Sequence, residues 1–361
     1  MDLFALGAED GDQLHWVEYE AFPVLPSAAA VGLTGCVLKL RRLLAMAAVA
    51  LLAVALGVVL AGPTVQAAPD LTPLQKFGAV LPGPAQVVPD LTPFQKLGAW
   101  VDVYDYAALD AWQATGVMKQ KGVRTIYLQT GRWNSPNASN TAEFADKAKV
   151  DWWVHSAHAR GMKVVGWYLP AYDDMERDVR RTVMIWTYRT DRGQRFDGVG
   201  IDIEYKGRVP SASAWNRAVL EHAKEVRRRL GAGAPIAAIT PAPLGMAIRP
   251  QDWSGFPWTG LAGQANVFMP MGYWSYRTDC ASNPRHCSYD YTKGNVTETR
   301  RLTGKPNVPV HVIGGVGDRV TVQQVDDYVT AAREVRAYGG SLYDYRTTEN
   351  SFWVPLANLN R

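Results

Sequence analysis

Eight strand-like apolar runs alternate with amphipathic helical segments in the C-terminal two thirds of this 361-residue chain. A repeated strand–helix order implies a parallel sheet, and eight such units imply a closed (β/α)8 barrel of the TIM type. An open doubly wound sheet is the alternative, but no GxGxxG motif follows the first strand. The predicted strands are 99–104, 123–129, 162–168, 197–203, 235–240, 266–272, 308–314 and 340–345, within a predicted domain of residues 97–361.

The fourth predicted strand ends in two acids. Residues 196–205 read FDGVGIDIEY, and side chains alternate along a strand, so Gly200, Asp202 and Glu204 share one face. Alpha carbons two positions apart are roughly 6 to 7 Å from one another, so one carboxylate can raise the pKa of the other. The pattern indicates a general acid that stays protonated near neutral pH. A purely structural pair that binds cations or backbone amides is the alternative.

Aromatic and polar residues also follow other predicted strands. The carboxyl ends of barrel strands meet at one end, where the active sites of such barrels lie. Aromatic rings beside carboxylates suit sugars, although each ring taken alone is more often a packing residue. We therefore predict a carbohydrate-binding cleft. Its candidate substrate-binding residues are Asp102, Trp167, Tyr168, Asp173, Met271, Trp274, Asp344 and Arg346, and Asp105, Trp133, Tyr172 and Tyr343 occupy similar positions.

The strand-four motif resembles the DGxDxDxE signature of the chitinase-like barrels of glycoside hydrolase family 18. Asp197, Gly198, Asp202 and Glu204 match it, and Gly200 stands in place of the middle aspartate. The resemblance implies that Glu204 protonates the glycosidic oxygen. It also implies that Asp202 stabilises the substrate's 2-acetamido group as that group attacks the anomeric carbon. Such substrate assistance requires an N-acetylated sugar and one protein acid.

A second similarity to this family lies on the sixth predicted strand. Residues 268–274 read FMPMGYW and resemble the family's Met-x-Tyr-Asp motif, with Trp274 in place of the aspartate. The resemblance implies that Tyr273 hydrogen-bonds the acetamido group. The tryptophan usual on the family's last strand has no evident counterpart in 341–345. Both motifs therefore favour a sugar-processing site more than they favour chitinase activity.

Three alternatives for the function remain open at this point. The Asp-x-Glu ending also resembles family 25 muramidases, whose further acids on strands one and eight would correspond to Asp102 or Asp105 and to Asp344. A second carboxylate, Asp344 or Asp173, would otherwise act as nucleophile or base. The third alternative is a sugar-binding barrel without catalysis. The leading prediction is a glycoside hydrolase that acts on a polysaccharide with N-acetylated sugars.

The segment before the barrel resembles an export signal. Basic residues precede an apolar run over 43–61, and a small-residue cleavage site follows, with cleavage expected after Ala67. The run is also long enough to span a bilayer as an uncleaved anchor. We expect 37–68 to be a signal peptide or membrane anchor, and the protein to be secreted or associated with the cell envelope. It would contact a membrane only if the run is not cleaved.

Two further segments precede the barrel. Residues 1–36 fit badly ahead of an export signal and are interpreted as an extension from a misplaced start. Residues 69–96 form a Pro-rich linker in which the motif that begins Pro-Asp-Leu-Thr-Pro at residue 69 recurs at residue 89. Two copies are too few for a repeat fold.

Charge and cysteine content exclude several classes of partner. The net charge of +4 is small, and the basic residues form no stripe, so no nucleic-acid partner is expected. The six histidines do not cluster, and no HExxH or CxxC motif occurs, so neither a metal nor a cofactor is expected. Cys280 and Cys287 bracket a short polar loop. In an exported domain they predict a disulfide, with two free thiols as the alternative.

Overall fold

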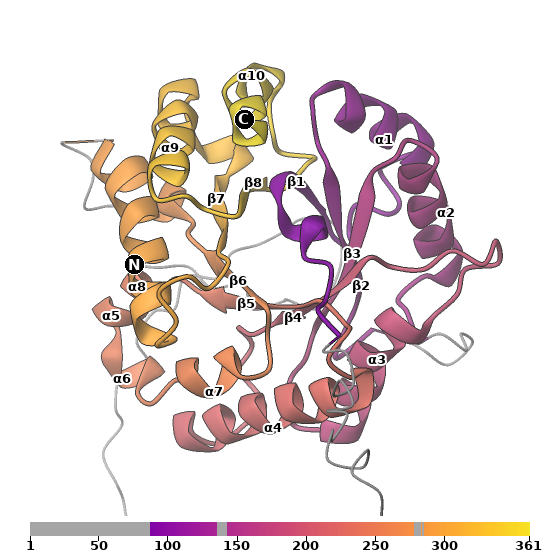
Figure 1. Ribbon diagram of the computed structural model, residues 1–361, viewed down its shortest axis with the longest axis vertical. Helices are drawn as coiled ribbons and strands as arrows, with labels where there is room; N and C mark the ends of the chain where they lie inside the picture. The colour runs from indigo at the N-terminus through magenta and orange to yellow at the C-terminus, as the bar shows by residue number, and fades with distance from the viewer. Residues whose placement is uncertain (1–86, 136–142, 278–282, 284) are drawn as a thin grey trace, which may run out of the picture. The chain divides into compact units, whose positions relative to one another are not determined.

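The computed structural model describes residues 87–135, 143–277, 283 and 285–361. Eight parallel strands close into one barrel in chain order, with helices around the outside (Figure 1), which confirms the predicted (β/α)8 fold. The strands are β1 Lys96–Val101, β2 Thr125–Arg132, β3 Lys163–Leu169, β4 Gly198–Asp202, β5 Ile236–Pro241, β6 Val267–Met271, β7 His311–Val316 and β8 Gly339–Tyr343.

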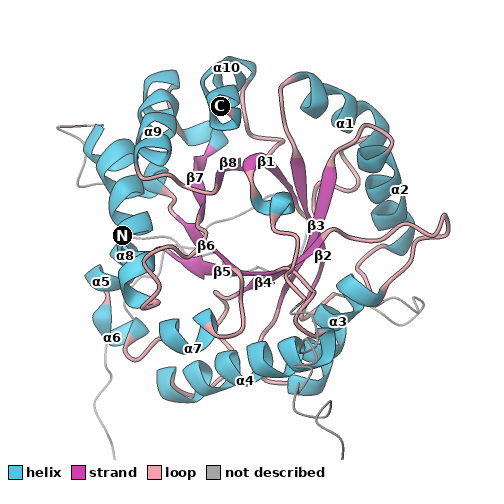
Figure 2. Ribbon diagram, viewed as in Figure 1, coloured by secondary structure: helices cyan, strands magenta, loops and turns pink. Residues whose placement is uncertain are grey.

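Helices follow the strands and cover the outside of the sheet (Figure 2). In α4, the buried residues Trp215, Val219, Ala223 and Val226 are spaced three or four positions apart, so one helix face packs inward. Within the described part of the chain, no helix is both long and apolar enough to cross a membrane. The helices are α1 Ala111–Gln120, α2 Lys147–His158, α3 Met175–Thr187, α4 Ala212–Leu230, α5 Pro243–Ile248, α6 Pro250–Trp253, α7 Trp258–Ala262, α8 Tyr291–Leu302, α9 Val322–Glu334 and α10 Trp353–Leu356.

Side-chain caps fix where five of these helices begin. Each capping side chain accepts a hydrogen bond from the backbone N–H three residues further on, which satisfies a donor that the first helical turn leaves free. The capping residues are Asp110, Asp146, Asp174, Ser211 and Thr321.

Several predictions fall outside the described residues. The predicted extension 1–36, the signal or anchor 37–68 and the linker up to residue 86 are among them, so these stay predictions. Cys280 is also outside, and the predicted disulfide to the buried Cys287 stays a prediction as well.

The first strand ends earlier than predicted. We expected it to run to residue 104, whereas β1 ends at Val101. The Asp102 carboxylate accepts hydrogen bonds from the backbone N–H groups of Tyr104, at 2.8 Å, and Asp105, at 3.3 Å. These bonds turn the chain away from the sheet, as aspartate side chains commonly do in turns. Asp102 and Asp105 therefore lie on a turn at the end of the strand.

The inside of the barrel is a packed core. Trp100 stacks on Tyr127 at 4.6 Å between ring centroids and meets the edge of Trp167 at 5.6 Å. His311 hydrogen-bonds the Tyr127 hydroxyl at 3.1 Å and the Ser341 hydroxyl at 3.0 Å. Burial lowers the pKa of His311 to about 4, so its ring is neutral. Interior side chains therefore fill the barrel below the strand ends, as in other barrels of this kind.

Gly200 faces this core, which explains its departure from the family 18 signature. A Cβ atom at Gly200 would lie 2.9 Å from the Cβ of Trp167 and 3.0 Å from Cδ1 of Ile239. Both contacts are closer than packed carbon atoms tolerate. The space that an aspartate side chain at position 200 would need is therefore occupied by Trp167 on β3 and Ile239 on β5.

Replacing Gly200 with alanine is expected to destabilise the barrel by about 1–3 kcal/mol, because the new methyl group overpacks the core. Urea denaturation of the Gly200→Ala variant measures this loss. Gly131→Ala is the matched control, since a Cβ there meets its nearest atom at 3.6 Å. Equal unfolding free energies for the two variants would contradict the packing argument.

Candidate active site

Asp202 and Glu204 lie at the mouth of the barrel, by which we mean the end where the strands' carboxyl ends meet. Asp202 is the last residue of β4 and is 5% exposed, whereas Glu204 is half-buried. The backbone N–H of Ile203 donates to the Ile239 carbonyl at 2.8 Å, so β4 stays beside β5 between the two acids. Both acids therefore lie at the carboxyl end of β4, where the sequence predicted them.

Burial controls the protonation of this pair. It raises the pKa of Glu204 to about 7, and the positive charge of Arg132 at the end of β2 partly offsets the effect. Burial also raises the pKa of Asp202 well above its ordinary value, and the negative charge of Glu204 raises it further. Oδ1 of Asp202 is buried and accepts no hydrogen bond from the described residues. The site thus holds a carboxylic acid near neutral pH and a free acceptor beside it.

Tyr273 follows β6 and lies near both acids. Burial, followed by the negative charges of Glu204 and Asp202, raises the pKa of its hydroxyl well above the ordinary value. The hydroxyl therefore stays protonated and can donate a hydrogen bond. The structure brings together the three residues predicted to be catalytic, while their roles stay predictions.

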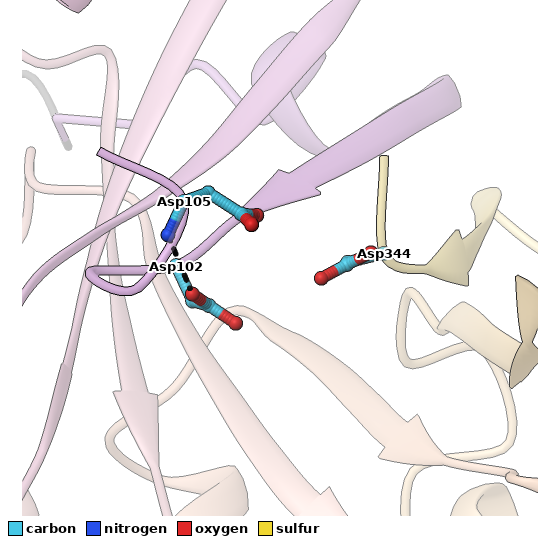
Figure 3. A group of neighbouring side chains, drawn as sticks. All are labelled: Asp102, Asp105 and Asp344. Atoms are coloured by element: carbon cyan, nitrogen blue, oxygen red, sulfur yellow. Dashed lines mark hydrogen bonds between the residues drawn. The ribbon is translucent and has the colours of Figure 1, made fainter. Parts of the chain in front are cut away.

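A second acidic group lies where β1 and β8 end (Figure 3). Asp102, Asp105 and Asp344 each offer a carboxylate oxygen within 4.8 Å of the other two, and all three side chains are buried. Burial raises the pKa of Asp102 to about 6 and that of Asp105 to about 8, and their negative neighbours contribute. Tyr343 donates to Oδ2 of Asp102 at 3.0 Å, and Arg346 lies 3.6 Å from Oδ1 of Asp105. We call these three aspartates the acid cluster.

A ring pair and an ion-pair group connect loops of the mouth. Trp133, after β2, stacks on Tyr205, after β4, at 5.3 Å between centroids, and the Arg208 guanidinium lies 4.6 Å from the Trp133 ring centroid. Asp173 binds Arg208 and also accepts from Arg177 at 2.6 Å. Although burial opposes the shift, these bonds hold the pKa of Asp173 below its ordinary value. Asp173 is therefore an ionised ion-pair partner rather than a proton donor.

Two predicted substrate-binding residues lie away from the mouth. Tyr168 faces the helices, where its hydroxyl donates to Oδ1 of Asp178 at 2.7 Å. Trp274 is 1% exposed and packs against Tyr328 at 4.9 Å between centroids. Neither ring has a free face for a sugar, which corrects both predictions. Trp167 and Met271 are also buried and belong to the core inside the barrel.

Strand alternation alone would have shown that Tyr168 on β3 faces away from the barrel axis. Neighbouring strand residues point to opposite faces, so Trp167 and Tyr168 cannot both face the barrel axis. Tyr205 was not predicted as a residue of the mouth because only folding brings it beside Trp133. Arg132 was missed because no motif marks the residue that ends β2.

Comparisons with known proteins identify the fold. No family model and no curated protein matches the sequence. A chitinase from Rhizomucor miehei is similar in structure, with a TM-score of 0.51 and 16% identity over 73% of this chain and 100% of that chain. A family 18 chitinase from Cycas revoluta in complex with (GlcNAc)4 has a TM-score of 0.51 and 10% identity, over 73% and 98% of the chains.

A third similar structure belongs to another glycoside hydrolase family. The family 5, subfamily 18 protein from Bifidobacterium longum subsp. infantis has a TM-score of 0.55 and 10% identity, over 73% of this chain and 78% of that chain. At these identities the likeness establishes a shared fold. The chain is a (β/α)8 barrel of the kind found in glycoside hydrolases of more than one family.

The raised pKa of Glu204 predicts a pH-dependent stability difference. In the unfolded chain this group ionises near 4.5, whereas in the folded protein it ionises near 7. The contribution of Glu204 to the free energy of unfolding is therefore most favourable below pH 4.5. It decreases by about 3 kcal/mol as the pH rises to 7. The Glu204→Gln variant lacks this loss, so it should gain stability relative to the wild type over that range. Denaturant titrations at pH 4.5 and 7.5 measure the gain, and parallel pH profiles would contradict the assignment.

Proposed function

We propose that this protein is a glycoside hydrolase in which Glu204 is the general acid. The observation that carries the proposal is the acid pair at the end of β4, in which Asp202 is buried, Glu204 is half-buried and the pKa of Glu204 is about 7. An acid with that pKa is substantially protonated at neutral pH and can transfer its proton to a leaving oxygen. The likeness to several glycosidase barrels supports the proposal at the level of the fold.

The proposed substrate is a polysaccharide that contains N-acetylated sugars, such as chitin or peptidoglycan. Oδ1 of Asp202, which lacks a partner among the described residues, would accept the hydrogen bond of the acetamido N–H. The Tyr273 hydroxyl would donate to the acetamido oxygen. Both contacts would orient that oxygen toward the anomeric carbon. Two of the similar structures are chitinases, and one of these is bound to (GlcNAc)4.

The proposed reaction has two steps. In the first, the acetamido oxygen bonds to the anomeric carbon, the glycosidic bond breaks, and the leaving oxygen takes the proton of Glu204. In the second, the Glu204 carboxylate removes a proton from water, and the water oxygen bonds to the anomeric carbon while the acetamido oxygen leaves. Glu204 ends the cycle protonated, so no other reactant is needed.

The same proposal places the protein outside the cytoplasm, where such polysaccharides occur. The predicted signal or anchor over residues 37–68 supports this location. Fractionation of cells that express the full chain tests it: recovery in the cytoplasm would contradict export.

A muramidase-like site is the second candidate. The acid cluster supports it, because its members follow β1 and β8, the strands where the family 25 resemblance implied further acids. In this reading Asp344 participates in catalysis beside Glu204. Replacing Asp344 with asparagine would then abolish cleavage of peptidoglycan as completely as replacing Glu204. A sugar-binding barrel without catalysis is the third candidate.

Hydrolysis assays on chitooligosaccharides, peptidoglycan and neutral glycans test the proposed acid. We expect the wild-type protein to release reducing ends from an N-acetylated substrate, and Glu204→Gln to reduce the rate about 10²–10⁴-fold because proton transfer is lost. Glu221→Gln is the matched control, since Glu221 is exposed on α4. It should retain the wild-type rate.

Three results would overturn parts of this proposal. If the wild type and Glu204→Gln hydrolyse a substrate equally, Glu204 is not the acid. If both proteins bind sugars and neither hydrolyses any of them, the barrel is a binding protein. Loss of activity in Asp344→Asn, with its fold intact by circular dichroism, would favour the muramidase-like site.

A further inference from the structure

The acid cluster has the geometry of a cation site. Its three carboxylates converge from the turn after β1 and from the end of β8, and those of Asp105 and Asp344 point toward each other (Figure 3). One oxygen from each residue lies within 4.8 Å of the others. Two oxygens bound to Ca²⁺ at roughly 2.3–2.6 Å are separated by no more than about 5 Å. Three oxygens no more than 4.8 Å apart lie within about 2.8 Å of a common centre, so small shifts of the side chains let one ion contact all three residues.

A second observation is independent of these distances. Oδ2 of Asp105 is buried and accepts no hydrogen bond from any residue that the structure describes, and the Asp105 side chain is only 3% exposed. A buried carboxylate oxygen without a donor is costly, and such atoms in folded proteins usually have a partner. The carboxylate that carries this oxygen points into the cluster in Figure 3.

The acid cluster contains three carboxylates, but only one basic side chain among the described residues lies within ion-pair distance of it. Arg346 is the basic residue in ion-pair range of Asp105, at 3.6 Å, and its side chain is 57% exposed. Among the described residues, no ion pair reaches Asp102 or Asp344. The Tyr343 hydroxyl contacts Asp102 as a neutral donor. Buried carboxylates stay ionised only where they are paired or coordinate a metal ion.

We propose that Asp102, Asp105 and Asp344 bind a hard divalent cation, with Ca²⁺ favoured. Carboxylate oxygens without imidazole or thiolate select Ca²⁺, Mg²⁺ or Mn²⁺ over softer metals. Calcium tolerates the irregular arrangement of oxygens better than magnesium, which requires a near-octahedral site. The ion would join the turn after β1 to the end of β8, and thus the first strand of the barrel to the last.

This inference goes beyond the proposed function and differs from the expectation that no metal binds. That expectation came from histidine and cysteine motifs, which an oxygen-only site does not contain. A cation held by Asp344 would also keep this carboxylate from acting as a nucleophile. The inference therefore favours the site on β4 over the muramidase-like candidate.

Terbium luminescence tests the site on the full chain after treatment with a chelator. Tyr343 contacts Asp102 and Trp100 lies near Tyr343, so bound Tb³⁺ should emit when these rings are excited. We expect saturation at one Tb³⁺ per chain and competition by Ca²⁺. Asp105→Asn and Asp344→Asn should each weaken binding roughly tenfold or more because a charged ligand is lost. Asp326→Asn, an exposed change on α9, is the control and should bind as the wild type does.

The melting temperature provides a second readout that does not depend on any variant folding. Ca²⁺ should raise the melting temperature of the wild type, because an ion that binds only the folded chain stabilises it. Absence of saturable Tb³⁺ emission together with an unchanged melting temperature would overturn the proposal. Equal Tb³⁺ affinity in the wild type and both cluster variants would do the same. Neither readout uses catalysis, so failure here leaves the proposed hydrolase untouched.

Discussion

Backbone pairing between β1 and β8 closes the sheet, and the position of every carboxylate at the mouth depends on it. The register pairs Lys96 with Gly339 and Leu97 with Gly340. This approach requires a residue without a side chain, since a Cβ atom at Gly339 would lie 2.5 Å from the Phe94 carbonyl oxygen and 2.7 Å from the Lys96 carbonyl oxygen. Closure brings the turn after the first strand beside the end of the last. The acid cluster exists only in the closed barrel.

Closure produces two acidic groups with different environments at one mouth. The pair at the end of β4 combines a buried Asp202 that has a free acceptor with a half-buried Glu204, while the acid cluster gathers three carboxylates around a common centre. Arg132 connects the two groups electrostatically, because its charge lowers the pKa of Asp102, Asp202 and Glu204. The Arg132 guanidinium thus limits how far burial raises the pKa of both acids at the end of β4 and of Asp102, while Arg346 has this effect on Asp105 and Asp344. In the proposed reaction this keeps Glu204 able to release its proton as well as to hold it.

The sequence predicted the fold and the location of the β4 acids, because both depend on short-range periodicity. All eight strands occur near their predicted positions, and the acid pair ends the fourth one. The predictions for Tyr168 and Trp274 were wrong because nearness to a strand end does not fix the direction of a side chain. Tyr168 points to α3 by strand alternation, and Trp274 packs against Tyr328 of α9.

Other features of the site depend on contacts that no linear pattern carries. The acid cluster joins residues from opposite ends of the domain. Trp133 meets Tyr205 only across the mouth, and Gly200 is explained by the size of Trp167 on the adjacent strand. These three features follow from the three-dimensional packing of side chains, so they could not be predicted from the sequence.

The central claim is that Glu204 delivers a proton to the glycosidic oxygen. A crystal structure of the Glu204→Gln variant with an N-acetylated oligosaccharide bound across the mouth tests this most directly. We expect the variant side chain to lie within about 3.2 Å of one glycosidic oxygen, as proton transfer requires. We also expect the acetamido group of the adjoining sugar to contact Asp202 and Tyr273. An oligosaccharide bound at the mouth with every glycosidic oxygen beyond the reach of position 204 would show that Glu204 is not the proton donor.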